Sequence, residues 1–172
     1  MHAAMRMRGH ACGVVAVAAV AAAFTALPAL AVGDGTLRAS GLQVVAPEGW
    51  ELVDHASAAA TAEPRTLLVV GTTGARAIES RCQVASYRVP AEGAVVVVIG
   101  WRDSLEEKPA LQLSKVRRPT FECFSGRGAV GQVTRRGRDY QVNVMVGDRA
   151  DAATLADALE VARSFGLAPR KS

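Results

Sequence analysis

Histidine, the usual base of hydrolytic catalysis, is scarce in this 172-residue sequence. Once the amino-terminal segment described below is set aside, His55 is the single histidine left, beside a stretch rich in alanine. Hydrolysis of the Ser-His-Asp kind needs an imidazole base, and neither a G-x-S-x-G elbow nor an S-x-x-K pair accompanies His55. A zinc ion needs three or four His, Cys or carboxylate ligands. We therefore expect no catalytic residue, no metal site and no cofactor.

Carboxylates remain as candidates, because a pair of them can act as acid and base on a glycan. The candidates are Glu106, Glu107, Glu122, Asp139 and Asp148. No spacing in the sequence pairs two of them, and the adjacent Glu106 and Glu107 are typical of a solvated charge run. An envelope hydrolase that uses carboxylates without a recognisable motif is therefore the alternative hypothesis.

Residues 126–131 form a literal G-x-G-x-x-G pattern. A dinucleotide site needs a helix to begin there, so that its N–H groups face a pyrophosphate. Instead, residues 132–134 alternate as a strand does. The pattern therefore predicts a glycine-rich β-turn and no nucleotide.

Basic residues are concentrated between positions 115 and 138. The candidates for an anion-binding site are Arg117, Arg118, Arg127, Arg135, Arg136 and Arg138. They fall on predicted loops and turns of neighbouring strands, where they could converge into a cationic patch. The predicted partner is an anionic envelope component, whether lipid, wall polymer or protein. Ordinary surface charge is the alternative, and the lack of interleaved aromatic residues argues against nucleic acid.

The amino terminus predicts export. Basic residues without an acid precede an uncharged run rich in Ala and Val at residues 11–27, and residues 29–31 offer the small side chains that a signal peptidase accepts. We expect residues 1–31 to be a cleavable signal peptide and residues 32–172 to be a single exported domain. A retained membrane anchor is the alternative, although the run is shorter than the roughly 20 residues of a span. The predicted location is secreted or extracytoplasmic, in the cell envelope.

Charge and cysteine usage fit this location. Removal of the signal takes two arginines with it and leaves 18 basic against 16 acidic residues, which is a weak indication of a nucleic-acid partner. Cys82 and Cys123 remain as an even pair, which predicts a disulfide in an oxidising compartment. Closing a loop of roughly 40 residues would stabilise the fold by about 4 kcal/mol. Two buried free thiols are the alternative.

Turn residues divide the exported part into short strands. Two β-hairpins are predicted, between residues 42–46 and 50–54 and between residues 84–89 and 94–99. Single strands are predicted at residues 66–70 and 110–113. Three consecutive antiparallel strands are predicted at residues 121–124, 129–134 and 140–146, with Gly137 in the last turn. Residues 55–65 are either a mobile loop or one helical turn.

The last element is a helix. Leu155, Ala158, Leu159, Ala162 and Phe165 have the spacing of one buried face. A capping residue at position 151 and a glycine at position 166 mark its two ends. The predicted fold class is α+β, a mostly antiparallel sheet with this carboxy-terminal helix packed on it and room for a second short helix.

Two stretches carry a resemblance to known proteins. Residues 41–50, an aliphatic strand followed by Pro, Gly and Trp, resemble the opening of PsbP-like domains, including mycobacterial LpqN-type lipoproteins. Residues 121–124 and 137–144, with the end of the helix at 162–165, resemble uncharacterised exported actinobacterial proteins. The resemblance implies an antiparallel sheet with flanking helices, an accessory or binding role, and no catalytic residues. The sequence departs from the LpqN type because it has no lipobox.

These observations together predict a non-enzymatic binding or accessory module of the cell envelope. Trp50 and Trp101 are candidates for a sugar-stacking platform, with packing at the rim of the core as the alternative. Nothing in the sequence predicts an oligomeric state.

Overall fold

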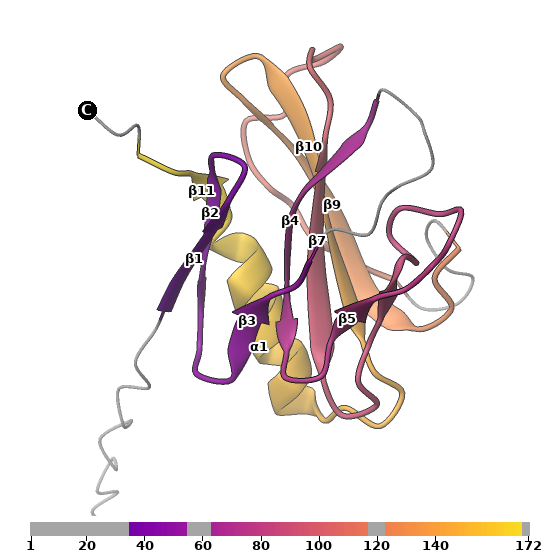
Figure 1. Ribbon diagram of the computed structural model, residues 1–172. Coiled ribbons are helices and arrows are strands. Elements are labelled where there is room, and N and C mark those ends of the chain that lie inside the picture. The colour runs from indigo at the N-terminus through magenta and orange to yellow at the C-terminus, as the bar shows by residue number, and fades with distance from the viewer. Residues whose placement is uncertain (1–34, 55–62, 117–122, 170–172) are drawn as a thin grey trace, which may run out of the picture. The chain divides into compact units, whose positions relative to one another are not determined.

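The computed structural model describes residues 35–54, 63–116 and 123–169. These residues form three antiparallel sheets and one helix (Figure 1). The α+β class is confirmed. Residues 55–62, most of the segment predicted to be a mobile loop or one helical turn, lie outside the described residues, as does the predicted signal peptide. The described residues contain one helix.

The largest sheet has six strands in the order β3-β4-β7-β10-β9-β8. Its strands are β3 (Trp50–Leu52), β4 (Arg65–Thr72), β7 (Ala94–Gly100), β8 (Ser114–Val116), β9 (Arg127–Arg135) and β10 (Arg138–Val146). A three-stranded sheet contains β1 (Gly35–Ala39), β2 (Leu42–Ala46) and β11 (Gly166–Leu167), and a two-stranded sheet contains β5 (Arg76–Ala77) and β6 (Tyr87–Arg88). The helix is α1 (Ala152–Arg163).

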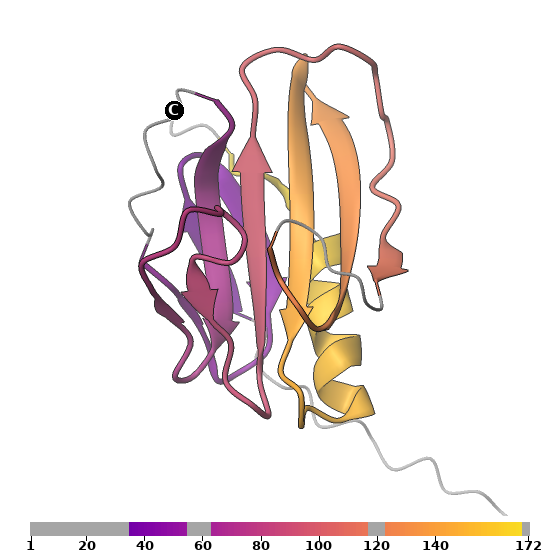
Figure 2. The ribbon, with the colours of Figure 1, turned by 90° about the vertical axis from the view of Figure 1, so that its right-hand side faces the viewer.

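The six-stranded sheet is covered on both faces, and β7 is buried at all seven positions. Successive side chains of a strand point to opposite faces. Val96 and Val98 therefore join the core on the side of α1, whereas Val95 and Val97 join a second core with Val84 and the aromatic ring of β6. The result is a layered domain in which α1 lies on one face of the large sheet and β5–β6 on the other (Figure 2).

The carboxy-terminal helix is confirmed, with small differences. Asp151 is the N-cap, and its Oδ1 accepts a hydrogen bond from the N–H of Thr154 at 2.7 Å, which lowers the pKa of its carboxyl. The helix ends at a C-cap on Ser164, because Gly166 already pairs with β2 as part of β11. Leu155 is partly buried, the other predicted residues are buried, and Val161 joins the buried face. No helix in the described part of the chain has the length and hydrophobicity of a membrane span.

Both amino-terminal hairpins were predicted wrongly. Residues 42–46 pair with β1 and β11, whereas β3 pairs with β4, so the two predicted partners lie in different sheets. Likewise, only Tyr87–Arg88 of the predicted strand at 84–89 is extended in a ladder, and it pairs with β5. A local turn signal marks where the chain bends. It does not say which strand the next segment joins.

The carboxy-terminal half matches the prediction more closely. β9 and β10 form the predicted hairpin, and its two turn residues, Arg136 and Gly137, have positive φ angles of 52° and 72°. A two-residue turn of this kind matches the twist of its strands. The third antiparallel strand, however, is Ser114–Val116, since Cys123 and Phe124 lie in a turn and an irregular segment. The strand predicted at residues 110–113 is found a few residues later in the chain, as β8.

Candidate functional site

The disulfide joins Cys82 to Cys123 as predicted, with Cα atoms 6.1 Å apart. Val84 and Phe124 lie close to the two cysteines in the chain. They pack into the core on the face of the large sheet away from α1. The bond therefore ties the segment before β9 to the layer that contains β5 and β6. It is a structural element of that layer.

Among the described arginines of the predicted anion-binding site, Arg135, Arg136 and Arg138 lie together at the β9–β10 turn, where Arg135 pairs with Arg138, whereas Arg127 lies apart from them. Arg127 begins β9, and its guanidinium donates to the carbonyl oxygens of Gly147 and Ala150. Arg135 ends the same strand, about 26 Å away at about 3.3 Å per residue. Its guanidinium donates to the carbonyl oxygen of Pro109 at 2.6 Å. Arg127 and Arg135 therefore lie at opposite ends of β9, and the anion-binding role of these arginines stays a prediction.

Of the other four arginines, two lie outside the described residues, namely Arg117 and Arg118. Arg136 and Arg138 are exposed at the β9–β10 turn. Arg138 lines a small cavity of about 210 Å³ with Arg65 and Arg102, which the sheet register brings close to it. Glu63 lies 3.0 Å from the guanidinium of Arg102, so this cluster contains its own acid. Sequence reasoning missed it because its members are far apart in the chain.

A larger hollow lies along the free edge of β9. The connection from β7 to β8 passes over the end of the β9–β10 hairpin and then follows the outer edge of β9 (Figure 2). Between this connection and the sheet are two cavities, of about 790 Å³ and 340 Å³. Lys108 and Gln132 line both of them. We call the combined hollow the edge groove, and the residues of it used below are Trp101, Leu105, Lys108, Ser114, Gln132 and Gln141.

The edge groove opens where β9 lacks a strand partner. The N–H of Thr134 donates to the carbonyl oxygen of Lys108 at 2.7 Å, and Ser114 pairs with Val130 at the start of β8. The residue between these two points, Gln132, presents its N–H and C=O to the same side, because backbone groups alternate along a strand. No hydrogen bond joins these two groups to the rest of the described chain. They border the groove.

Side-chain amides form an ordered row beside this gap. Gln132 and Gln141 are directly opposite each other in the β9–β10 ladder, on the face away from α1. The Nε2 of Gln132 donates to the Oε1 of Gln141 at 3.3 Å, and the Nε2 of Gln141 donates to the Oδ1 of Asn143 at 2.8 Å. Asn143 is fully buried, and its Nδ2 donates to the carbonyl oxygen of Val97 at 3.4 Å. The row therefore has one end fixed in the core.

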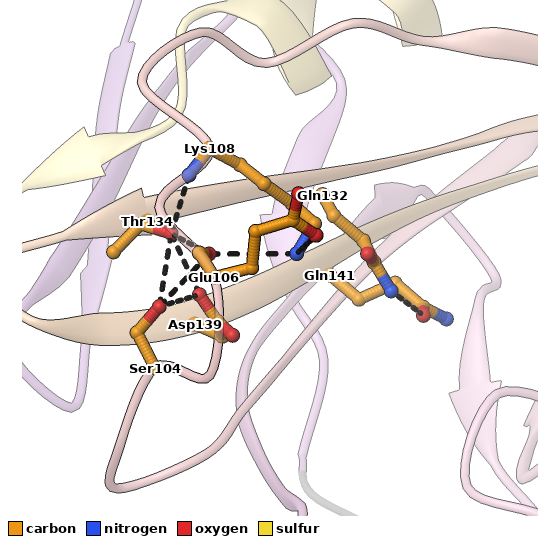
Figure 3. A network of polar contacts seen from close by, with 7 residues as sticks. All are labelled: Ser104, Glu106, Lys108, Gln132, Thr134, Asp139 and Gln141. Carbon is orange, nitrogen blue, oxygen red and sulfur yellow. Dashed lines mark hydrogen bonds and ion pairs between the residues drawn. The ribbon is translucent and has the colours of Figure 1, made fainter.

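A second network holds the connection in place (Figure 3). The Oδ1 of Asp139 accepts hydrogen bonds from Thr134 at 2.7 Å and from Ser104 at 2.8 Å. The hydrogen bond from Thr134 is the main cause that lowers the pKa of the Asp139 carboxyl, with that from Ser104 also contributing. Lys108 lies 3.5 Å from the carboxylate of Glu106. The wall of the groove is thus pinned to β9 and β10 by a charged carboxylate.

Apolar surface borders the smaller cavity. Trp101 is half-buried, packs against the second core and lines the cavity that Gln132 also lines. Leu105 on the same connection is fully exposed, although large apolar side chains are usually covered. The groove therefore combines an indole, an uncovered leucine and neutral amides with charged side chains, among them Glu107 and Lys108.

The glycine motif is not the predicted turn, because all of it except Gly126 lies in strand β9. A Cβ at Gly128 would lie 1.9 Å from the carbonyl oxygen of Val144, and one at Gly131 would lie 2.6 Å from the carbonyl oxygen of Gln112. Close packing of backbone against backbone explains both glycines. A strand follows them, with no helix to hold a pyrophosphate.

Titratable side chains form no further constellation in the described ranges. No group of three or more His, Cys, Asp or Glu residues is arranged there to hold a metal ion. His55 and Glu122 lie outside these ranges. Asp148 is exposed in the turn before α1, remote in the fold from Asp139 at the other end of β10.

Comparisons of the chain with protein families, with curated proteins and with solved structures found no match. The resemblance to PsbP-like domains therefore stays a prediction. The structure is an α+β domain with a polar groove, partly rimmed by apolar side chains, at one edge of its large sheet.

Proposed function

We propose that this protein is an exported binding module of the cell envelope and that the edge groove is its binding site. The observation that carries the proposal is the gap at Gln132, where an open backbone N–H and C=O lie beside an ordered row of side-chain amides. Gln132 is exposed, and an unpaired backbone N–H and C=O at a sheet edge can take a ligand as partner. The larger cavity also lies within the 300–1,000 Å³ typical of ligand sites.

The proposed location rests on two independent features. The amino terminus has the composition of a signal peptide, and Cys82 is bonded to Cys123. Disulfides persist in extracytoplasmic compartments and are rare in the cytosol. The groove contains neutral amides and is not a cationic patch. Among the envelope components, it therefore fits a wall polymer best.

The carboxyl chemistry of the groove supports binding over hydrolysis. A general acid must be protonated near neutral pH, so its pKa has to be raised. The pKa of Asp139 is lowered, chiefly by the hydrogen bond from Thr134. Its oxygen already accepts two hydroxyl groups of the protein itself. Asp139 therefore serves to hold the connection, and the envelope hydrolase remains the second hypothesis.

Cosedimentation of the purified protein with isolated, insoluble bacterial cell walls tests the proposal. We expect the protein to sediment with the walls, and we expect replacement of both Gln132 and Gln141 by Ala to reduce the bound fraction at least about tenfold, since two polar contacts of about 1 kcal/mol each would be lost. Gln43→Ala is the matched control, because Gln43 lies on β2 of the small sheet. A protein that stays in the supernatant, or binding that the double substitution leaves unchanged, would contradict the proposal. Release of soluble wall fragments would instead favour the hydrolase.

A further inference from the structure

We infer that the edge groove recognises the acetamido group of an N-acetylated amino sugar in a polymer. The inference rests on the proposed function and names its ligand class. Three features carry it: the single open backbone pair at Gln132, the amide row, and the indole of Trp101 in the adjoining cavity.

The open edge offers one backbone donor and one backbone acceptor, which is too little for an added strand. An added peptide strand bonds to every second residue along an edge, which on this side of β9 means Val130, Gln132 and Thr134. Val130 already pairs with Ser114, and Thr134 already donates to Lys108. Only Gln132 is left, with one donor and one acceptor on the same side. The N–H and C=O of a secondary amide point in opposite directions, so the acetamido C=O accepts from the N–H of Gln132 while a hydroxyl group of the same sugar donates to the C=O of Gln132.

The amide row fits the hydroxyl groups of a sugar. Because Gln132 donates one N–H to Gln141 and the row ends at buried Asn143, the Gln132 amide is oriented before any ligand arrives. Its Oε1 remains an acceptor, and Ser114, which lines the same cavity, supplies a hydroxyl that can donate or accept. Sugar hydroxyls also both donate and accept, so neutral groups of this kind can pair with them without a charge.

The indole of Trp101 supplies the apolar part of the site. Trp101 and Gln132 line one cavity, so a ring next to the acetamido-bearing sugar reaches the indole. One face of a pyranose carries mainly C–H groups, and a flat aromatic surface buries them at little cost in conformational entropy. A chain of linked sugars therefore fits an acetamide contact at Gln132 followed by a stacking contact at Trp101.

Titration of the ¹⁵N-labelled protein, with its disulfide intact, tests the ligand class. The probe is tri-N-acetylchitotriose, and cellotriose is the control, since it has the same β-1,4-linked pyranose rings without acetamido groups. We expect the acetylated trimer to shift the amide resonance of Gln132 and the indole N–H resonance of Trp101, and we expect cellotriose to bind at least about tenfold more weakly. Equal binding of both trimers would overturn the inference, as would shifts confined to the surroundings of Trp50, which lines a separate cavity.

A pair of substitutions isolates the backbone contact. Gln132→Ala removes the side chain and keeps the N–H, whereas Gln132→Pro removes both, and proline is tolerated where a strand N–H is unpaired. We expect Gln132→Pro to bind the acetylated trimer about threefold to tenfold more weakly than Gln132→Ala. Equal affinity of the two folded variants would contradict the inference. Should the proline variant fail to fold, Trp101→Ala tests the same site, with Trp50→Ala as its control. The inference expects Trp101→Ala to weaken binding of the acetylated trimer. A loss of affinity in Trp50→Ala alone would overturn the inference.

The outcomes separate the two proposals. Cell-wall binding that depends on Gln132 and Gln141 together with no response to tri-N-acetylchitotriose would reject the acetamido inference and leave the binding module standing. A different outcome is that cell walls and a short acetylated peptide bind at Gln132 whereas tri-N-acetylchitotriose does not. This result would show that the open edge takes a peptide amide instead. Absence of wall binding and of any shift at Gln132 would reject both.

Discussion

At the scale of single residues, Asp139 links the connection to the sheet. It is a half-buried carboxylate that accepts hydrogen bonds from Ser104 on the connection and Thr134 on β9. Hydrogen bonds to a charged group stabilise more than neutral ones do. Asp139 is therefore the residue on which the placement of Leu105 and Lys108 along the groove depends.

We expect Asp139→Asn to lower the free energy of unfolding by about 1 kcal/mol at pH 7, because an amide accepts the same hydrogen bonds without the charge. The folded pKa of Asp139 lies below its usual value, so its contribution is present above the unfolded pKa and is lost as the pH falls through the folded pKa. Urea unfolding at pH 7 and near pH 3 measures the effect, which should shrink at the lower pH. Asp148→Asn, at an exposed position, is the control. A difference that grows toward acid pH would contradict this account.

Part of the site could have been found from the sequence. The two-residue turn at Arg136–Gly137 was predictable, and Gln132 and Gln141 are equally far from it in the chain. A two-residue hairpin places such residues opposite each other. The gap in the edge could not be predicted, because it depends on where residues 108–114 return to β9. That return is fixed by contacts such as the Thr134–Lys108 hydrogen bond, which has no local signature.

At the scale of elements, β9 is shaped by glycine. Gly128 faces Met145 in the ladder, and a Cβ there would lie 1.9 Å from the backbone oxygen of Val144. Backbone atoms of the central sheet cannot move aside as a flexible side chain can. The close approach of β9 to β10 therefore requires a residue without a Cβ.

We expect Gly128→Ala to destabilise the protein by about 2–3 kcal/mol, in the range typical of overpacking in a core. The control is Gly35→Ala on β1, where a Cβ would meet nothing closer than 3.9 Å. Thermal unfolding of the two variants measures the difference, and only the Gly128 variant should melt at a clearly lower temperature. A Gly128 variant as stable as the wild type would show that β9 can shift relative to β10.

The strands themselves were easier to predict than their partners. Leu42, Val44 and Ala46 alternate as a half-buried strand, and the structure confirms the strand. Its partners are β1, which precedes it, and β11, which comes more than 100 residues later. Turn chemistry acts over a few residues, whereas pairing across such a separation is decided by which faces must be buried together. The hairpins at the amino-terminal half failed for this reason.

At the scale of the whole domain, the two faces of the six-stranded sheet are covered in different ways. On one face α1 contributes four buried residues to the core. On the other face the described residues of the covering layer include two strands of two residues each, together with irregular segments. Short strands of this kind have few hydrogen bonds of their own. The Cys82–Cys123 disulfide joins this layer to the segment before β9 and so supplies a constraint that secondary structure does not.

We expect replacement of both cysteines by serine to lower the free energy of unfolding by about 2–4 kcal/mol, because the disulfide closes a loop between residues 41 positions apart and restricts the unfolded chain. This would be a large share of the 5–15 kcal/mol typical of a domain. Urea unfolding of the wild type with and without a reductant measures it, and the reduced wild type should match the double variant. The reductant should leave the double variant unchanged, and wall binding at 10 °C should persist in it, since Gln132 and Gln141 lie within the β9–β10 ladder. Two thiols titrated in the unfolded, unreduced wild type, or a double variant of full stability, would refute the role of the disulfide in holding this layer.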